Sequence, residues 1–177
     1  MIVLCFVVVA LARQIGTLHL RLGPRGALEL DDEGPPLGEA PPAIDALALS
    51  GESITIGGPG EAQLLLFVSP GCHVCEQVLP SLPAIASSGS FRPYVVTDVD
   101  VFDTARSLDV GTISAPVIPG RDVAIAYEVP GTPYVVMLDT SGIVRAKGTV
   151  NNLEQMEGLV DTATRRIANS GVGSHTN

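Results

Sequence analysis

The residues best suited to chemistry are two cysteines separated by two residues, in the segment Cys72-His73-Val74-Cys75. Such a C-x-x-C spacing serves either as half of a zinc site or as a redox-active dithiol. Zinc needs two further ligands, but the chain has no second C-x-x-C, and its other histidines, His19 and His175, lie near the two ends. We therefore predict a redox dithiol that uses no metal and no cofactor. The third cysteine, Cys5, lies in an apolar run and is expected to pack as a small hydrophobic residue.

The composition is that of one globular domain with a short extension. The chain has 177 residues, of which 46% are hydrophobic and 16% are charged. Its net charge of -9 would repel a phosphate backbone, and it has no Trp and few other aromatic residues to stack on bases. Nucleic acid is therefore excluded as a partner. The charge is uneven, because residues 1–30 hold three Arg and only one Glu.

The cysteine pair follows a pattern that predicts a strand and then a helix. Residues 62–68 form a short continuous apolar run, which is typical of a strand buried on both faces, and Ser69-Pro70-Gly71 ends it. Apolar residues then recur at helical spacing through residue 85, with Pro80 expected to kink the helix. Cys72 should therefore lie at the exposed N-terminal end of this helix.

The remaining pattern predicts an α/β fold with a mixed central sheet flanked by helices. The predicted strands are residues 94–99, 134–138 and 143–146, the last two joined by the hairpin turn 139–142, and the predicted helices are 102–108, 122–127 and 153–167.

The chain begins with an apolar segment, Ile2 to Ala12, that ends at Arg13. A membrane-spanning helix needs about 20 apolar residues, so this run predicts an anchor helix whose start lies upstream of Met1. A cleaved signal or a buried helix is the alternative, and a first core strand fits less well because no turn chemistry follows. We predict an anchor and juxtamembrane helix over 1–22, a Pro/Gly-rich linker over 23–36, the domain over 37–168 and a flexible tail over 169–177.

Several segments together resemble the thioredoxin fold and its redoxin and TlpA/ResA-like branch. These are the strand leading into the C-x-x-C, Pro80 five residues after Cys75, the opening Leu37-Gly38-Glu39-Ala40-Pro41, and Val129-Pro130-Gly131-Thr132-Pro133 before a strand. The last segment resembles the one that places a cis-proline opposite the dithiol. The resemblance therefore implies a cis bond before Pro133, with the backbone of Thr132 free to pair with an extended substrate strand beside Cys72.

The N-terminal region is similar to that of the MauD family of methylamine utilization proteins, which are membrane-anchored and thioredoxin-like. The similarity lies in residues 11–24, from Leu11-Ala12-Arg13-Gln14 to Gly23-Pro24, and in Ser69-Pro-Gly-Cys-His-Val-Cys75. It implies maturation of the disulfide-rich small subunit of methylamine dehydrogenase or a related amine dehydrogenase. It also implies a membrane-bound, quinone-linked partner that recycles the dithiol.

Disulfide exchange requires a thiolate, so the pKa of the attacking thiol must fall below the ordinary value of about 8.5. The unpaired N–H groups at a helix start favour an anion, and Cys72 is placed to receive them. His73 can add a positive charge or a hydrogen bond, or it can simply face water. Cys75 should be the buried, resolving thiol. The strand before the pair lacks the buried carboxylate that thioredoxin uses as a proton acceptor.

Other functions compete with a protein thiol–disulfide oxidoreductase. A peroxiredoxin-like peroxidase would want a Ser or Thr three residues before its reactive Cys, and Ser69 meets this spacing, but the close partner Cys75 favours the dithiol. A TlpA/ResA-type reductase for cytochrome c maturation and a non-catalytic binding module are further alternatives. Reduction potential depends on the folded surroundings of both sulfurs, so both directions of electron flow stay open.

The expected location is outside the cytoplasm, where disulfides persist, with the N-terminus as anchor and residues 31–177 on the outer side. One observation opposes this expectation. Arg13, Arg21 and Arg25 follow the apolar run, and basic residues beside a spanning helix usually stay in the cytoplasm. We give the redox argument more weight, because the charge rule compares two flanks and the sequence has almost none before the run.

Overall fold

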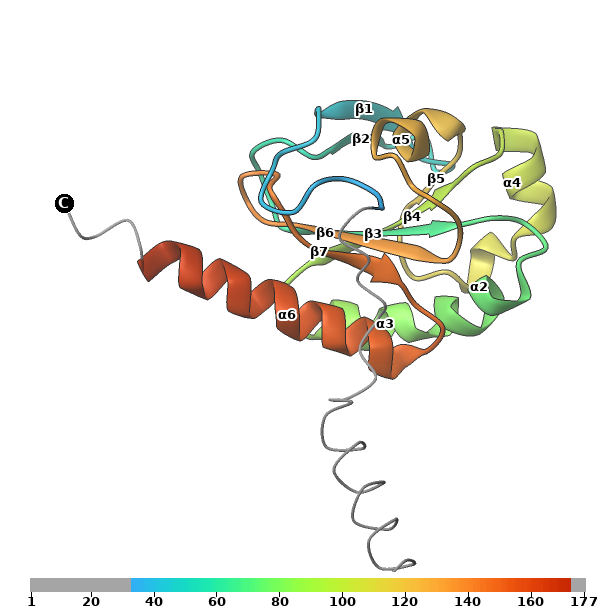
Figure 1. Cartoon of the computed structure of the whole chain (residues 1–177). Coiled ribbons are helices and arrows are strands. Elements are labelled where there is room, and N and C mark those ends of the chain that lie inside the picture. The colour runs from blue at the N-terminus through green and yellow to red at the C-terminus, as the bar shows by residue number, and fades with distance from the viewer. Residues whose placement is uncertain (1–32, 173–177) are drawn as a thin grey trace, which may run out of the picture.

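The computed structural model describes residues 33–172, which form an α/β domain around a five-stranded mixed sheet (Figure 1). The strand order is β5-β4-β3-β6-β7. The strands are β3 (Gln63–Val68), β4 (Arg92–Thr97), β5 (Val117–Ile118), β6 (Tyr134–Leu138) and β7 (Val144–Thr149). The central strand β3 runs parallel to β4 and antiparallel to β6, which confirms the predicted mixed sheet.

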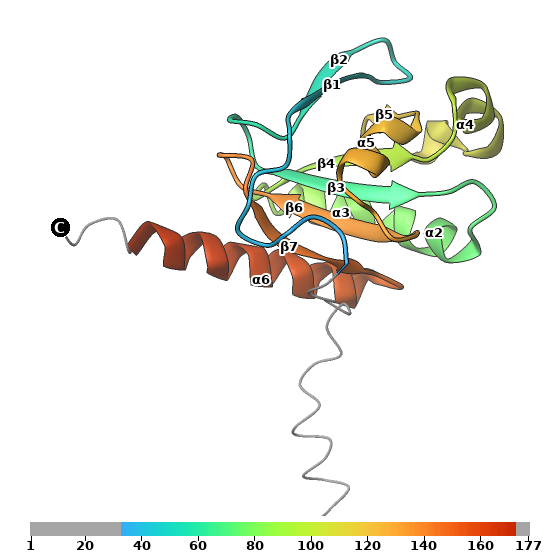
Figure 2. The same cartoon turned by 45° about the horizontal axis from the view of Figure 1, so that its top comes forward.

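Different elements cover the two faces of the sheet, as Figures 1 and 2 show. Helices α2 (His73–Val78), α3 (Leu82–Ser87) and α6 (Leu153–Val172) pack on one face. Helix α5 (Arg121–Ala126) and a separate hairpin, β1 (Ile44–Leu47) with β2 (Ser53–Ile56), cover the other. Helix α4 (Val101–Ser107) and the 3-10 turn Val110–Thr112 join β4 to β5.

Strand β3 is buried along its whole length because both faces of the sheet are covered. Leu64 and Leu66 belong to the core beneath α2, α3 and α6, whereas Leu65 and Phe67 belong to the core beneath α5 and the hairpin. Successive side chains of a strand point to opposite faces, so each core takes alternate residues. The predicted strand over 62–68 is thereby confirmed, and its continuous apolar pattern is explained.

The helix after the cysteine pair is interrupted where Pro80 was expected to kink it. The segment Leu79–Ser81 forms a 3-10 turn between α2 and α3. Proline lacks the N–H that an α-helix needs at this point, so the chain tightens and changes direction. The buried side chains Val78, Leu82 and Ile85 nevertheless all belong to the same core.

Three strands were absent from the sequence prediction. The β1–β2 hairpin does carry a signal, because Ile54 and Ile56 alternate with Ser53 and Thr55 after a Ser-Gly turn, and both isoleucines are buried. Strand β5 has only two residues, which is too short for any periodicity to appear.

The ends of the domain differ in part from the predicted boundaries. Helix α6 continues past Ile167 to Val172, so residues 169–172, expected in the flexible tail, are helical. Residues 33–36, expected in the linker, lie against the sheet, because the carbonyl of Glu33 accepts hydrogen bonds from the Tyr134 hydroxyl (3.0 Å) and from Lys147 Nζ (2.7 Å). The predicted anchor over 1–22 lies outside the described residues. Within the described part of the chain, no helix is long and apolar enough to cross a membrane.

Candidate active site

Cys72 and Cys75 form a disulfide at the start of α2, with their Cα atoms 5.2 Å apart. Cys72 is the N-cap residue of the helix and is partly exposed, whereas Cys75 is only 1% exposed and belongs to the core. One sulfur of the bond is therefore accessible from outside and the other is not. The assignment of Cys72 as the attacking thiol and Cys75 as the resolving thiol requires this asymmetry, and the two roles stay a prediction.

The backbone at the helix start is arranged to stabilise negative charge on the accessible sulfur. The Cys75 amide donates a hydrogen bond to Cys72 Sγ at 3.2 Å. This is the position at which a capping side chain satisfies one of the free N–H groups of a helix. After reduction, a thiolate at Cys72 would be a stronger acceptor for the same donor than a neutral thiol.

His73 is exposed and contacts residues of its own helix. Its side chain is 81% exposed and lies 3.7 Å from a carboxylate oxygen of Glu76, measured from Nδ1. Its Nε2 is 3.0 Å from Nε2 of Gln77, so both of these partners lie on α2 itself. A positive charge on this exposed ring would be screened by solvent and offset by Glu76, and the tuning role of His73 stays a prediction.

The register of the sheet brings Thr132 and Pro133 to the cysteines. Phe67 of β3 pairs with Tyr134 of β6 in antiparallel register, so the residues after β3 lie opposite those before β6. The Thr132–Pro133 bond is cis, as predicted, and the carbonyl oxygen of Thr132 lies 4.0 Å from Cys72 Sγ. Pro133 is buried, and Thr132 is partly exposed.

Two further polar side chains, not assigned to the site from the sequence, lie behind Thr132. The Thr132 hydroxyl donates to Ser69 Oγ at 3.0 Å, and Ser69 Oγ donates to a carboxylate oxygen of Asp98 at 2.7 Å. In the sequence, Ser69 is distinguished by its spacing from Cys72 and by its place in the break after the strand, whereas no motif distinguishes Asp98. The sequence does contain a signal that could have found these residues. Ser69 and Asp98 directly follow an apolar strand, and Thr132 shortly precedes one.

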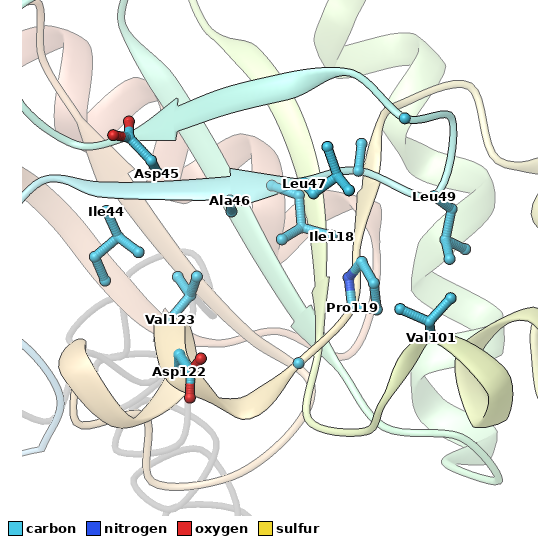
Figure 3. Close-up of a pocket in the computed structure, with 13 residues that line it drawn as sticks. Ile44, Asp45, Ala46, Leu47, Leu49, Val101, Ile118, Pro119, Asp122 and Val123 are labelled. Carbon is cyan, nitrogen blue, oxygen red and sulfur yellow. The ribbon is translucent and has the colours of Figure 1, made fainter.

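A separate groove lies between β1 and the connection from β5 to α5 (Figure 3). It has a volume of about 390 Å³, and its walls include Ile44, Leu47, Val101 and Pro119, with Asp45 and Asp122 at its edge. Neither cysteine lines it. We therefore do not assign this groove to the redox site. Within residues 33–172, no group of three or more His, Cys, Asp and Glu side chains is placed to hold a metal ion.

Solved structures with the same architecture are thioredoxin-like. StoA from Bacillus subtilis matches with a TM-score of 0.57 and 18% identity over 68% of this chain and 97% of that one. The thioredoxin domain of a thiol-disulfide oxidoreductase from Bacteroides vulgatus matches with a TM-score of 0.57 and 21% identity over 72% and 97%. A peroxiredoxin-like protein from Aquifex aeolicus matches with a TM-score of 0.58 and 18% identity over 74% and 87%. At these identities the likeness establishes the thioredoxin-like fold alone.

The fold, together with a disulfide between an accessible and a buried cysteine, defines a thioredoxin-like thiol–disulfide oxidoreductase. No protein-family model matches the chain. Curated relatives do: methylamine utilization protein MauD of Methylorubrum extorquens is 36% identical over 85% of this chain and 75% of that protein. MauD of Paracoccus denitrificans is 33% identical over 88% and 79%. The chain belongs to the MauD family.

Proposed function

We propose that this oxidoreductase is held at the membrane by its N-terminal segment and acts on proteins outside the cytoplasm, where it forms disulfides in the small subunit of an amine dehydrogenase. The observation that carries the proposal is the placement of the accessible Cys72 sulfur 4.0 Å from the Thr132 carbonyl, with Cys75 buried behind it. A partner can reach one sulfur and a backbone edge at the same time.

The oxidation of a substrate proceeds in two exchanges. A substrate thiolate attacks Cys72 Sγ, a substrate–Cys72 disulfide forms, and the Cys72–Cys75 bond breaks with Cys75 leaving as a thiolate that takes up a proton. The second substrate thiolate then attacks the substrate sulfur of this mixed disulfide and releases Cys72 as a thiolate. The substrate loses two electrons to the cysteine pair. Reduction of a substrate disulfide is the same sequence in reverse.

Backbone pairing would give the enzyme its preference for protein substrates. An extended segment that passes Cys72 can place its N–H groups against the carbonyl of Thr132, as a strand added to an edge does. Thr132 and Pro133 are thus the proposed substrate-binding residues. Such pairing involves the backbone of the substrate and not its side chains. It therefore suits a substrate whose cysteines lie in many different local sequences.

The relatives' name supports a substrate within methylamine utilization. The test is to express Cys75→Ser in the host and to identify by mass spectrometry the proteins bound to Cys72. Cys75→Ser cannot form the Cys72–Cys75 disulfide, so its Cys72 thiolate attacks a disulfide already formed in the substrate, and one substrate sulfur leaves as a thiolate. The mixed disulfide should accumulate because Cys75 is no longer present to attack it. Recovery of the amine dehydrogenase small subunit would support the proposal, and its absence from a host that makes the enzyme would refute this substrate. Cys72→Ser, which retains only the buried thiol, is the matched control.

Location outside the cytoplasm is supported by the working disulfide and by the acidic domain that follows the apolar segment. Alkaline phosphatase, which is active only in the periplasm, would be fused after Asn177 in the host. Activity of the fusion would support the proposed orientation. A reporter that works only in the cytoplasm would overturn both the location and the oxidative role. In the proposed location outside the cytoplasm, a membrane-bound redox partner would reoxidise the Cys72–Cys75 pair after each turnover.

The dithiol function is favoured over a peroxidase by the bonds that Ser69 makes. Its hydroxyl donates to Asp98 and accepts from Thr132, so both of these hydrogen bonds are made to groups other than the sulfur that a peroxidase would activate.

The redox equilibrium with glutathione separates the proposed oxidant from a TlpA/ResA-type reductase. An oxidant should remain largely reduced at a glutathione ratio that oxidises a reductant.

A further inference from the structure

Three polar side chains from three different segments meet at the edge of the sheet that carries the redox pair. Val68 of β3 pairs with Thr97 of the parallel strand β4, so the next residues, Ser69 and Asp98, leave the sheet side by side. The antiparallel register of β3 and β6 places Thr132 opposite Ser69. Strand register alone therefore brings Ser69, Asp98 and Thr132 together, although 63 residues separate Ser69 from Thr132.

These side chains form a hydrogen-bonded series that ends on a carboxylate. The Thr132 hydroxyl donates to Ser69 (3.0 Å), which donates to Asp98 (2.7 Å). A bond that ends on a charged acceptor is stronger than one between neutral groups and polarises the bond before it. The series thus restrains the residue whose carbonyl lies beside Cys72 Sγ.

Asp98 is itself held from two directions and is partly removed from water. Nε of Arg121 at the start of α5 donates to the main-chain carbonyl of Asp98 at 2.9 Å. The second carboxylate oxygen of Asp98 is buried, with no hydrogen-bond partner among the described residues. Asp98 also lines a small cavity of about 110 Å³, together with Ser69 and Thr132.

We infer that Ser69 and Asp98 are positioning residues that hold Thr132 in the orientation needed to pair with an extended substrate. The inference rests on the proposed function, since the hydrogen-bonded series would act on the binding of protein substrates. It would leave the intrinsic reactivity of the disulfide unchanged. A small dithiol reaches Cys72 without any backbone pairing. A peptide dithiol needs the Thr132 carbonyl in place.

The test compares two reductants on the full chain, purified in detergent in its oxidised form. One is a synthetic peptide with two cysteines in an extended sequence, and the other is dithiothreitol. Each is converted into its disulfide while the Cys72–Cys75 pair becomes a dithiol. In Ser69→Ala, kcat/KM for the peptide should fall about tenfold, through KM, because the anchor of Thr132 is lost. The rate with dithiothreitol should change less than about twofold.

Two further variants distinguish positioning from general damage. Ser69→Thr keeps a hydroxyl, and the neighbouring cavity has space for its methyl group, so peptide oxidation should be restored to within about threefold of wild type. Asp98→Asn keeps the shape of the acceptor but removes its charge. Its kcat/KM should fall about threefold with the peptide and stay unchanged with dithiothreitol. Ser87→Ala removes an exposed hydroxyl on α3, whose bond to the Pro83 carbonyl is remote from the site, and serves as the control.

The outcomes separate this inference from the proposed function. Equal losses with peptide and dithiothreitol, or no loss with either in both Ser69→Ala and Asp98→Asn, would overturn the positioning role while leaving the oxidoreductase intact. A wild-type protein that reacts with the peptide no faster than with dithiothreitol would overturn the proposed substrate pairing, and the inference with it. A double variant Ser69→Ala/Thr132→Val should lose no more than the larger single loss, since both changes interrupt one series.

Discussion

Replacement of Gly142 by Ala tests the contact that joins the β6–β7 turn to the segment before β3. Gly142 has φ of +78°, and a Cβ added there would lie 2.6 Å from the main-chain nitrogen of Gly58 and 2.9 Å from its carbonyl oxygen. Both neighbouring atoms are backbone, so no side chain can rotate away. The turn is further fixed by the Gly142 amide, which donates to the Asp139 carbonyl at 2.9 Å.

Two costs contribute to the expected loss of stability. An L-residue in the left-handed region costs about 1 kcal/mol, and displacement of a packed backbone adds about 2 kcal/mol, by analogy with overpacked cores. The sum of about 3 kcal/mol is a large part of the stability of an ordinary domain. For a domain of this size it corresponds to a fall in melting temperature of about 10 °C.

The matched control is Gly60→Ala in the neighbouring segment. Gly60 donates to the Thr140 carbonyl of the same turn, but a Cβ there meets no atom within 4 Å. Its free energy of unfolding should change by less than about 1 kcal/mol. Both variants would be unfolded in urea with the disulfide intact and followed by circular dichroism, and unchanged m-values would show that the unfolded state is the same. A loss in Gly142→Ala no larger than that in Gly60→Ala would refute the argument.

Three other expectations concern the redox pair and the β6–β7 turn. Cys72→Ser should abolish exchange while Cys75→Ser traps mixed disulfides on gels, and equal trapping by both would refute the assignment of the accessible sulfur. His73→Ala should shift the thiolate titration of Cys72, followed by absorbance at 240 nm, upward by less than about one pH unit and make the pair more reducing, because the exposed ring acts through solvent; an unchanged titration would show that His73 is a bystander. Burial raises the pKa of Asp139, but hydrogen bonds from the amides of Ile143 and Ser141 and from Arg145 outweigh it and lower the pKa below the ordinary 3.8. Its stabilising contribution is therefore present above the ordinary pKa of 3.8 and is lost as the pH falls through the lower folded-state pKa. Asp139→Asn should cost about 2 kcal/mol in urea unfolding at pH 7 and progressively less as the pH falls below 3.8, and a cost that does not fall with pH would contradict this.

The sequence alone was sufficient for features that depend on neighbouring residues. A continuous apolar run predicts β3, the Ser-Pro-Gly break ends it, and the helical spacing that follows places Cys72 at the N-cap and Cys75 in the core. These are local rules of periodicity and chain breaking, so they need no knowledge of the rest of the fold. The resemblance to known proteins added the expectation of a cis bond before Pro133, which is also confined to one segment.

The tertiary structure decided what depends on the pairing of distant strands. The parallel register of β3 and β4 and the antiparallel register of β3 and β6 place Asp98 and Thr132 beside Ser69, and no pattern along the chain specifies a register between strands that far apart. Sequence thus determined which sulfur is accessible, and the fold determined which polar groups surround it.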